Sequence, residues 1–254
     1  HKMYTKVKEI LIKIGLSIVV LLFITILLTK RFLYFRPSST FLPVNETYKV
    51  VRQGHLHGWL AEGNPGSKIV LICHSNKGNI SHVASTIESL RSLGYSVLAF
   101  DYSGFGKSSG IPNEQQLYDD ASYMVALLRQ SYQAKDIILY GHGLGAPVAT
   151  YVSRRYDIPT LILVSPFLSV KSIVNNTVLR YISILFSEFN TEKYLSGYTG
   201  RSLMIHSTED ELVPYLSISR LQSLVTTHIP STGTNQDIYI PWDRVRGFIE
   251  NILE

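Results

Sequence analysis

Only one cysteine, Cys73, occurs among the 254 residues, so the chain cannot form an internal disulfide. It ends an apolar run, and we expect it to pack as a small buried hydrophobic side chain. Internal repeats and low-complexity segments are also missing, which excludes repeat architectures. No spacing of histidine, cysteine and carboxylate residues is typical of a metal site, so the sequence predicts neither a metal nor another cofactor.

Acidic residues are outnumbered, with 19 Asp and Glu against 24 Lys and Arg and a formal net charge of +5. A nucleic-acid surface would need a basic patch within a folded domain, and none is evident, so no nucleic-acid partner is predicted. Cations on both sides of an apolar segment are instead typical of a membrane anchor. Many of the cations lie near the start of the chain, at Lys2, Lys6, Lys8, Lys13, Lys30, Arg31 and Arg36.

Charge is absent from residues 14–29, which form one apolar run. The run is a little shorter than the ~20 residues that span a bilayer, but residues 10–12 extend it if Lys13 reaches the surface with its charged end. A cleaved signal peptide would have a shorter apolar region and small residues at its end, whereas this run ends in a threonine and two cations. We therefore expect a retained single-pass membrane anchor over residues 1–35 and a folded domain over residues 36–254. The cations on the two flanks nearly balance, so the side of the membrane is not predicted.

Beyond the anchor, apolar strand-like runs alternate with amphipathic helical segments. This alternation is typical of an α/β domain with a mostly parallel sheet. The first two strands, joined by a turn at residues 53–55, have the pattern of a hairpin. The expected strands are residues 48–52, 56–61, 68–73, 96–100, 137–140, 160–164 and 203–206, and the expected helices are residues 81–93, 114–129 and 242–253.

An insert of about residues 166–200 interrupts the alternation. Its apolar residues recur at mostly helical spacing between Val170 and Phe186. One interpretation is a further helix packed on the sheet. The other is a small cap over a site, apolar because it faces an acyl chain or the membrane.

The most informative stretch is Gly141-His142-Gly143-Leu144-Gly145, which follows the apolar run at residues 137–140. It fits G-x-S-x-G, the nucleophile elbow in which a sharp strand-to-helix turn raises one side chain above the sheet. The serine position is occupied by Gly143. Glycine accepts the strained backbone of such a turn, so we expect the fold to tolerate this residue.

Three more segments follow expected strands, at residues 74–82, 101–110 and 206–214. Together with the elbow, and in this order, they resemble the membrane-associated α/β-hydrolase-domain proteins, a group that includes protein depalmitoylases. The resemblance extends from about Phe35 to the C-terminus. It implies an α/β-hydrolase fold with a mostly parallel eight-stranded sheet, helices on both faces, and the insert as a small cap behind an N-terminal transmembrane helix.

The resemblance also implies roles for individual residues. The catalytic acid corresponds to Asp210, and the oxyanion hole to the backbone N–H groups of Leu144 and Asn76. The family's base histidine would lie near residues 231–237, but no histidine follows His228. Gln236 is the best match to the base position.

Thr234 is the second match to the position of the family's base histidine. Nucleophile and base are therefore both replaced, and a triad without its nucleophile retains at best ~10³–10⁴-fold catalysis over water. Ser103, in a glycine-rich loop rather than on an elbow, is not a credible substitute nucleophile.

Two hypotheses follow. The first is a membrane-tethered serine-hydrolase-family protein, lipase-, esterase- or acyl-thioesterase-like, that is inactive because Gly143 and Gln236 replace nucleophile and base. The second is a membrane-tethered pseudoenzyme that binds a lipid or a protein partner. In either case the expected ligand is a membrane lipid or an acylated substrate, and the oligomeric state is not predicted.

Overall fold

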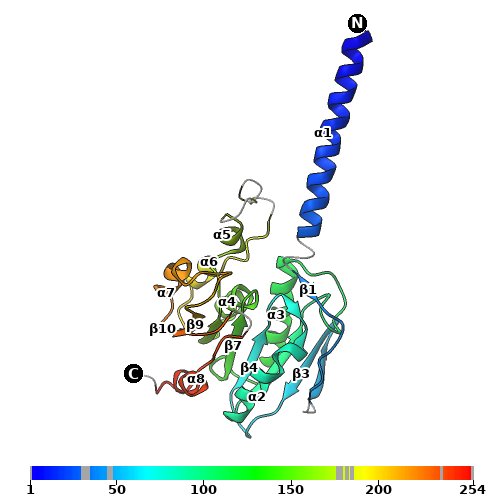
Figure 1. The fold of residues 1–254 in the computed structure, drawn as a ribbon. Helices are drawn as coiled ribbons and strands as arrows, with labels where there is room; N and C mark the ends of the chain where they lie inside the picture. Colours follow the sequence, from blue (N-terminus) through cyan, green and yellow to red (C-terminus); the bar gives the residue numbers. More distant parts are fainter. Residues whose placement is uncertain are drawn as a thin grey trace. The chain divides into compact units, whose positions relative to one another are not determined.

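The chain divides into two compact units, His1–Arg36 and Pro37–Glu254. A computed structural model describes residues 2–29, 35–44, 48–175, 180, 183, 186–234 and 237–252. The first unit contains one long helix and the second contains a sheet with its helices (Figure 1).

Helix α1 (Lys2–Thr29) covers the apolar run of the first unit. Its segment Met3–Leu27 has 25 residues and contains an 18-residue window with a mean hydropathy of 2.9, enough by length and composition to cross a membrane. A signal sequence near an N-terminus has the same properties. The expected single-pass anchor, and with it the domain boundary at residue 36, therefore stays a prediction.

The second unit is built on an eight-stranded sheet in the order β10-β9-β8-β7-β4-β6-β3-β2. Strands β10 to β6 are parallel, whereas β3 pairs antiparallel with both β6 and β2. The predicted mostly parallel eight-stranded sheet is confirmed. The strands of the sheet are β2 (Lys49–Gln53), β3 (Leu56–Ala61), β4 (Ile69–Cys73), β6 (Ser96–Asp101), β7 (Ile137–His142), β8 (Thr160–Val164), β9 (Arg201–Ser207) and β10 (Thr227–Ser231), and two short strands are β1 (Arg36–Pro37) and β5 (Lys77–Gly78).

Helices connect the strands, as parallel pairing requires (Figure 1). The predicted helix over residues 81–93 instead begins as a 3₁₀ turn, because the Asn79 side chain accepts a hydrogen bond from the Ser81 N–H. The helices are α2 (Ala84–Ser92), α3 (Glu114–Leu128), α4 (Gly145–Arg155), α5 (Val170–Asn175), α6 (Thr191–Leu195), α7 (Ser219–Gln222) and α8 (Trp242–Ile249), with 3₁₀ turns η2 (Ile80–Val83), η3 (Ala134–Asp136) and η5 (Tyr215–Ile218).

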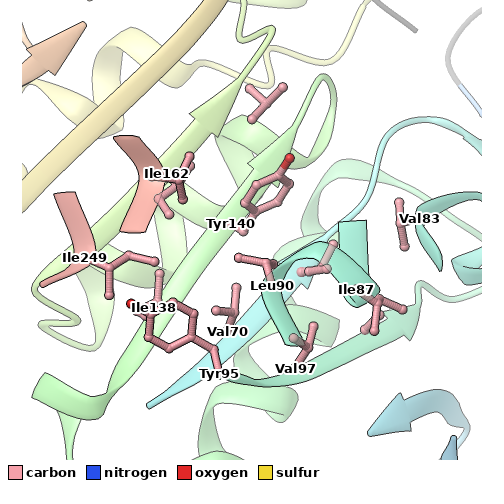
Figure 2. Packing of buried hydrophobic residues seen from close by; sticks show 14 of the residues in the cluster. Val70, Val83, Ile87, Leu90, Tyr95, Val97, Ile138, Tyr140, Ile162 and Ile249 are labelled. Atoms are coloured by element: carbon pink, nitrogen blue, oxygen red, sulfur yellow. The ribbon is translucent and has the colours of Figure 1, made fainter. Parts of the chain in front are cut away.

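One face of the sheet packs against α2 and α8. Figure 2 shows part of this cluster, in which Val70 and Ile138 lie among Leu90 of α2 and Ile249 of α8. Each of these side chains is at most 1% exposed. Burying an aliphatic side chain of this size contributes about 1.5–3 kcal/mol, so this layer fixes the position of the strands.

The other face is covered by α4, which contacts β4, β7 and β8, and by α3, which packs on α4. Two glycines allow the close approach of α4 to the sheet. A Cβ on Gly141 would lie 2.8 Å from the Cα of Ala146, and one on Gly145 would lie 1.9 Å from the carbonyl oxygen of Cys73. Helix α4 therefore begins directly above the ends of β4 and β7.

The insert at residues 166–200 contains α5 and α6, and its residues 188 and 189 contact α3. The Glu114 carboxylate accepts backbone N–H bonds from Glu188 (2.9 Å) and Phe189 (2.7 Å), and the Phe189 side chain is fully buried. Within the insert, Val178, Leu179, Ile182 and Leu185 lie outside the described residues. The interpretation of the insert as a cap stays a prediction.

Candidate active site

Four loops that carry the predicted site residues emerge at one edge of the sheet. They follow β4, β7, β9 and β10, and these strands are parallel, so their carboxyl ends point the same way. Strands β4 and β7 are neighbours, while β9 lies two strands from β7, roughly 10 Å away at the usual strand spacing. In open α/β sheets this carboxyl edge is where ligands bind.

The turn at Gly143 has the backbone of a nucleophile elbow. Its φ is +53°, in the left-handed region, and it joins the end of β7 directly to α4. The Gly143 N–H donates to the Val164 carbonyl (3.0 Å) and its own carbonyl accepts from the Ala146 N–H (3.0 Å). The turn is thus fixed on both sides, to β8 and to the first turn of α4, and the residue at its tip is glycine.

The loop after β4 lies against this tip. A Cβ built on Gly143 would be 2.9 Å from the Ser75 hydroxyl oxygen and 3.6 Å from the Ser75 Cβ. The Ser75 hydroxyl donates to the Asn76 side-chain oxygen at 3.3 Å. The two predicted oxyanion positions, Asn76 and Leu144, thus belong to the two segments that meet here.

Ser75 was not singled out by the sequence prediction. The available signal is that lipases and esterases with an HGGG-type oxyanion loop carry glycine after the histidine, and this chain carries serine after His74. The His74 Nδ1 hydrogen-bonds to the Ser75 carbonyl oxygen at 2.7 Å, so this histidine supports the loop.

Asp210 lies in the loop after β9, and its side chain is fully buried. One carboxylate oxygen accepts the backbone N–H groups of Leu212 and Val213, each at 2.9 Å. The other lies 3.7 Å from the Nε2 of His206, whose N–H donates to the Val213 carbonyl at 2.8 Å. Asp210 therefore shapes its loop, and its assignment as the catalytic acid stays a prediction.

The loops after β9 and β10 are tied to each other. The Thr208 N–H donates to the Ser231 carbonyl (2.9 Å), and the Gly233 N–H donates to the Glu209 carboxylate (3.1 Å). Thr234, the second match to the base position, follows Gly233 and is exposed. Gln236, the first match, lies outside the described residues.

Two other potential nucleophiles, Cys73 and Ser103, have unsuitable environments. Burial raises the pKa of the Cys73 thiol to about 12, so the thiolate is scarce at neutral pH. The buried Ser103 hydroxyl donates to Asp120 (2.9 Å) and accepts from His55 (2.7 Å), in the loop after β6. Among the described residues, no group of three or more His, Cys, Asp or Glu side chains is placed to hold a metal ion.

A shallow depression elsewhere in the domain is not part of this arrangement. Its lining includes Lys68 and Tyr95, which directly precede β4 and β6. It therefore lies at the amino edge of the sheet, opposite the four loops, and we assign it no role.

Buried histidines predict an acid-sensitive fold. Burial lowers the pKa values of His74 and His206 below the ordinary 6.5, because a cation loses hydration there. The unfolded chain then binds more protons than the folded chain below about pH 6.5, so stability is full above that pH and falls as pH decreases. Denaturant unfolding across pH 5–7 should show this loss, with a slope of at most about 1.4 kcal/mol per pH unit per histidine. His206→Gln should make the loss shallower; a curve parallel to that of the unmodified chain would contradict the prediction.

The sheet order, the elbow and the position of α4 define an α/β-hydrolase fold. The chain belongs to the Hydrolase_4 family, serine aminopeptidase S33, whose profile matches residues 64–213. This match confirms the resemblance seen in the sequence. The predicted roles of Gly143, Asp210, Gln236, Asn76 and Leu144 are not tested by it.

Similar proteins include membrane and lipase members of the group. The lysophosphatidylserine lipase ABHD12 of Danio rerio is 30% identical over 202 residues, which are 71% of this chain and 53% of that protein. Alpha/beta hydrolase domain-containing protein 17C of Homo sapiens is 31% identical over 156 residues, 59% of this chain and 46% of that protein. An uncharacterised membrane protein of Saccharomyces cerevisiae is 28% identical over 233 residues, 84% of this chain and 82% of that protein. The chain thus spans about half the length of the first two relatives.

Two solved structures support the fold. The Pyrococcus furiosus esterase Pf2001 aligns with a TM-score of 0.66 at 20% identity, covering 85% of this chain and 98% of the esterase. Est1E from Butyrivibrio proteoclasticus, with ferulic acid bound, aligns with a TM-score of 0.64 at 16% identity, covering 80% and 96%. At these identities the likeness concerns the fold alone.

Proposed function

We propose that this chain is a membrane-tethered protein of the lipase- and esterase-like α/β hydrolases that does not form an acyl-enzyme. The observation that carries the proposal is Gly143, a residue without a side chain at the tip of an elbow with φ of +53°. In serine hydrolases the hydroxyl at this tip attacks the acyl carbonyl and a histidine takes its proton. Neither group is available from Gly143 or from Gln236, which has an amide and no basic nitrogen.

The proposal assigns the remaining roles to residues of the same loops. The N–H groups of Leu144 and Asn76 would stabilise an oxyanion, and Asp210 would orient a base. Hydrogen-bond donors of this kind contribute to catalysis even without a nucleophile. Together with substrate binding, they accelerate the reaction at best ~10³–10⁴-fold over water. The proposed substrate class is an acyl ester or thioester, consistent with the lipase relative from Danio rerio.

A second candidate function is binding without turnover. It is favoured by the same elbow, because a glycine at 143 removes reactivity and leaves the turn and its hydrogen bonds in place. The ligand would be a membrane lipid or an acylated protein partner. The residues that close relatives encode at positions 143 and 234–236 distinguish the two candidate functions. Glycine at 143 and glutamine at 236 in those relatives would favour binding without turnover.

The tether proposed here is α1. The apolar part of its segment Met3–Leu27 and the membrane relative from yeast support membrane association. The single-pass arrangement, with residues 1–35 as the anchor, belongs to the proposal.

The test uses a serine-directed fluorophosphonate on membranes that contain the full chain, first washed with alkaline carbonate. An anchored chain stays in the pellet, and recovery in the supernatant contradicts the tether. The unmodified chain should acquire no adduct, whereas Gly143→Ser combined with Gln236→His should be labelled at residue 143. Thr234→His replaces Gln236→His in a parallel variant, because the register of the base position is open by two residues.

Peptide mass spectrometry locates the adduct. Labelling of the unmodified chain at any serine of the second unit would overturn the proposal that it lacks acyl-enzyme chemistry. Failure of both double variants, also with alanine at position 75 and with unfolding midpoints close to that of the unmodified chain, would overturn the proposal that the remaining site is competent.

A further inference from the structure

Ser75, in the loop after β4, is a polar side chain at the elbow that has been given no role so far. Ser75 is half-buried, and its hydroxyl oxygen lies only 2.9 Å from the place where a side chain on residue 143 would begin. We propose that position 75 controls whether residue 143 can carry a working nucleophile, because the Ser75 hydroxyl occupies space that a side chain at 143 needs. This inference rests on the proposed function, since it concerns the same loops at the carboxyl edge of the sheet.

The obstacle is specific to one atom. The Ser75 Cβ lies 3.6 Å from the ideal Cβ of residue 143, an ordinary van der Waals contact, whereas the hydroxyl oxygen at 2.9 Å is too close for the carbon to be added without a shift. The flanking glycines differ, because at Gly141 and Gly145 an added Cβ would meet the backbone. A change of side chain at 75 alone therefore removes the conflict at 143.

Rotation of the Ser75 side chain would relieve the contact but would change the site. The hydroxyl would leave its acceptor on Asn76, the residue whose backbone N–H is proposed for the oxyanion hole. It would also remain close enough to accept a hydrogen bond from a serine at 143, in competition with the base. Displacements of about 1 Å in a catalytic group reduce rates by up to ~10²-fold.

The first arm of the test measures fluorophosphonate labelling rates of the full chain in detergent, with Gln236→His, or Thr234→His if that is the register that labels, in every variant. Gly143→Ser is compared with Gly143→Ser combined with Ser75→Ala, which removes only the hydroxyl. We expect labelling to be about 10-fold faster or more with alanine at 75. Ser75→Cys is the matched control, because it keeps a heavy atom at the γ position and should give no acceleration. Equal rates with serine and alanine at 75 would overturn the inference.

The second arm does not depend on activity. Gly143→Ala adds only a Cβ, and its melting temperature is measured with serine and with alanine at position 75. The left-handed backbone penalises alanine equally in both backgrounds, so it cancels from the comparison. Contact between the two side chains predicts that the loss caused by Gly143→Ala is smaller by about 2 °C or more when position 75 is alanine.

Additive melting-temperature changes would overturn the inference even if no variant is labelled. If no variant is labelled but the melting-temperature changes of Gly143→Ala and Ser75→Ala are not additive, the contact between positions 75 and 143 is supported. The same result would contradict the proposal that the remaining site can still react. If labelling rates are equal with serine and alanine at position 75 and the melting-temperature changes are additive, the proposed function is unaffected. Position 75 then has no influence on residue 143.

Discussion

Replacing Gly145 with alanine should lower the unfolding free energy of the second unit by about 3 kcal/mol or more. The added Cβ would lie 1.9 Å from the carbonyl oxygen of Cys73, 2.6 Å from its carbonyl carbon and 2.8 Å from the carbonyl oxygen of His74. All three atoms belong to the backbone at the end of β4, a central strand, so no side-chain rotation relieves the overlap. Alanine is otherwise the better helix former by about 1 kcal/mol, so destabilisation here must come from the close approach.

Guanidinium unfolding of the detergent-solubilised full chain measures the loss, with the fluorescence of Trp59 and Trp242 as the signal. Gly143→Ala is the matched control, because it lies in the same turn but meets only the Ser75 hydroxyl and the cost of a left-handed backbone, roughly 1–2 kcal/mol. If Gly145→Ala were no more destabilising than Gly143→Ala, the packing of α4 on β4 described above would be wrong.

Replacing Asp101 with alanine should cost about 3–5 kcal/mol, because it leaves buried donors without their acceptor. Its fully buried carboxylate accepts from the Nδ1 of His57 (3.0 Å), the Ile80 N–H (2.9 Å) and the Lys107 N–H (3.3 Å). These donors come from β3, from η2 and from the glycine-rich loop after β6. One carboxylate therefore joins three segments, and its loss should loosen all of them.

The same unfolding assay tests this prediction, and hydrogen exchange at residues 80 and 107 reports the local loosening. Asp119→Ala is the control, since Asp119 is an exposed carboxylate that accepts only from the Gln115 side chain (2.9 Å) in the hydrogen bonds described. That control should stay within about 0.5 kcal/mol of the unmodified chain. An equal effect of the two substitutions would show that Asp101 has no special structural role.

Much of the fold could be predicted because its signals are local. Mostly apolar runs such as residues 68–73 and 137–140 are typical of strands buried on both faces, and both form central strands of the sheet. The elbow was predicted from three glycines at fixed spacing, and each now has a separate physical reason. Gly141 allows the backbone of α4 to approach closely, Gly145 allows the same for the backbone of β4, and Gly143 has the left-handed φ of the turn.

The parts that escaped prediction depend on contacts between segments far apart in the chain. Ser75 and Gly143 are brought together by the pairing of β4 with β7, which no local pattern specifies. The start of α2 also depends on a long-range contact. The Asn79 side chain, which caps η2 before α2, donates to the carbonyls of Ser38 and Thr40. The predicted base at Gln236 and residues 176–179, 181–182 and 184–185 of the insert lie outside the described residues, so the predictions for them stay as they were.

The unequal surroundings of the three elbow glycines have an evolutionary consequence. Selection for folding should act more strongly at 141 and 145, where an added Cβ would meet backbone, than at 143, where it would meet one hydroxyl and the cost of a left-handed φ. A lineage can therefore lose or regain a reactive residue at 143 while the scaffold persists, with position 75 and the base position as the other steps. In this architecture, the mutational path between a hydrolase and a non-hydrolytic descendant is only about three substitutions long by this reasoning.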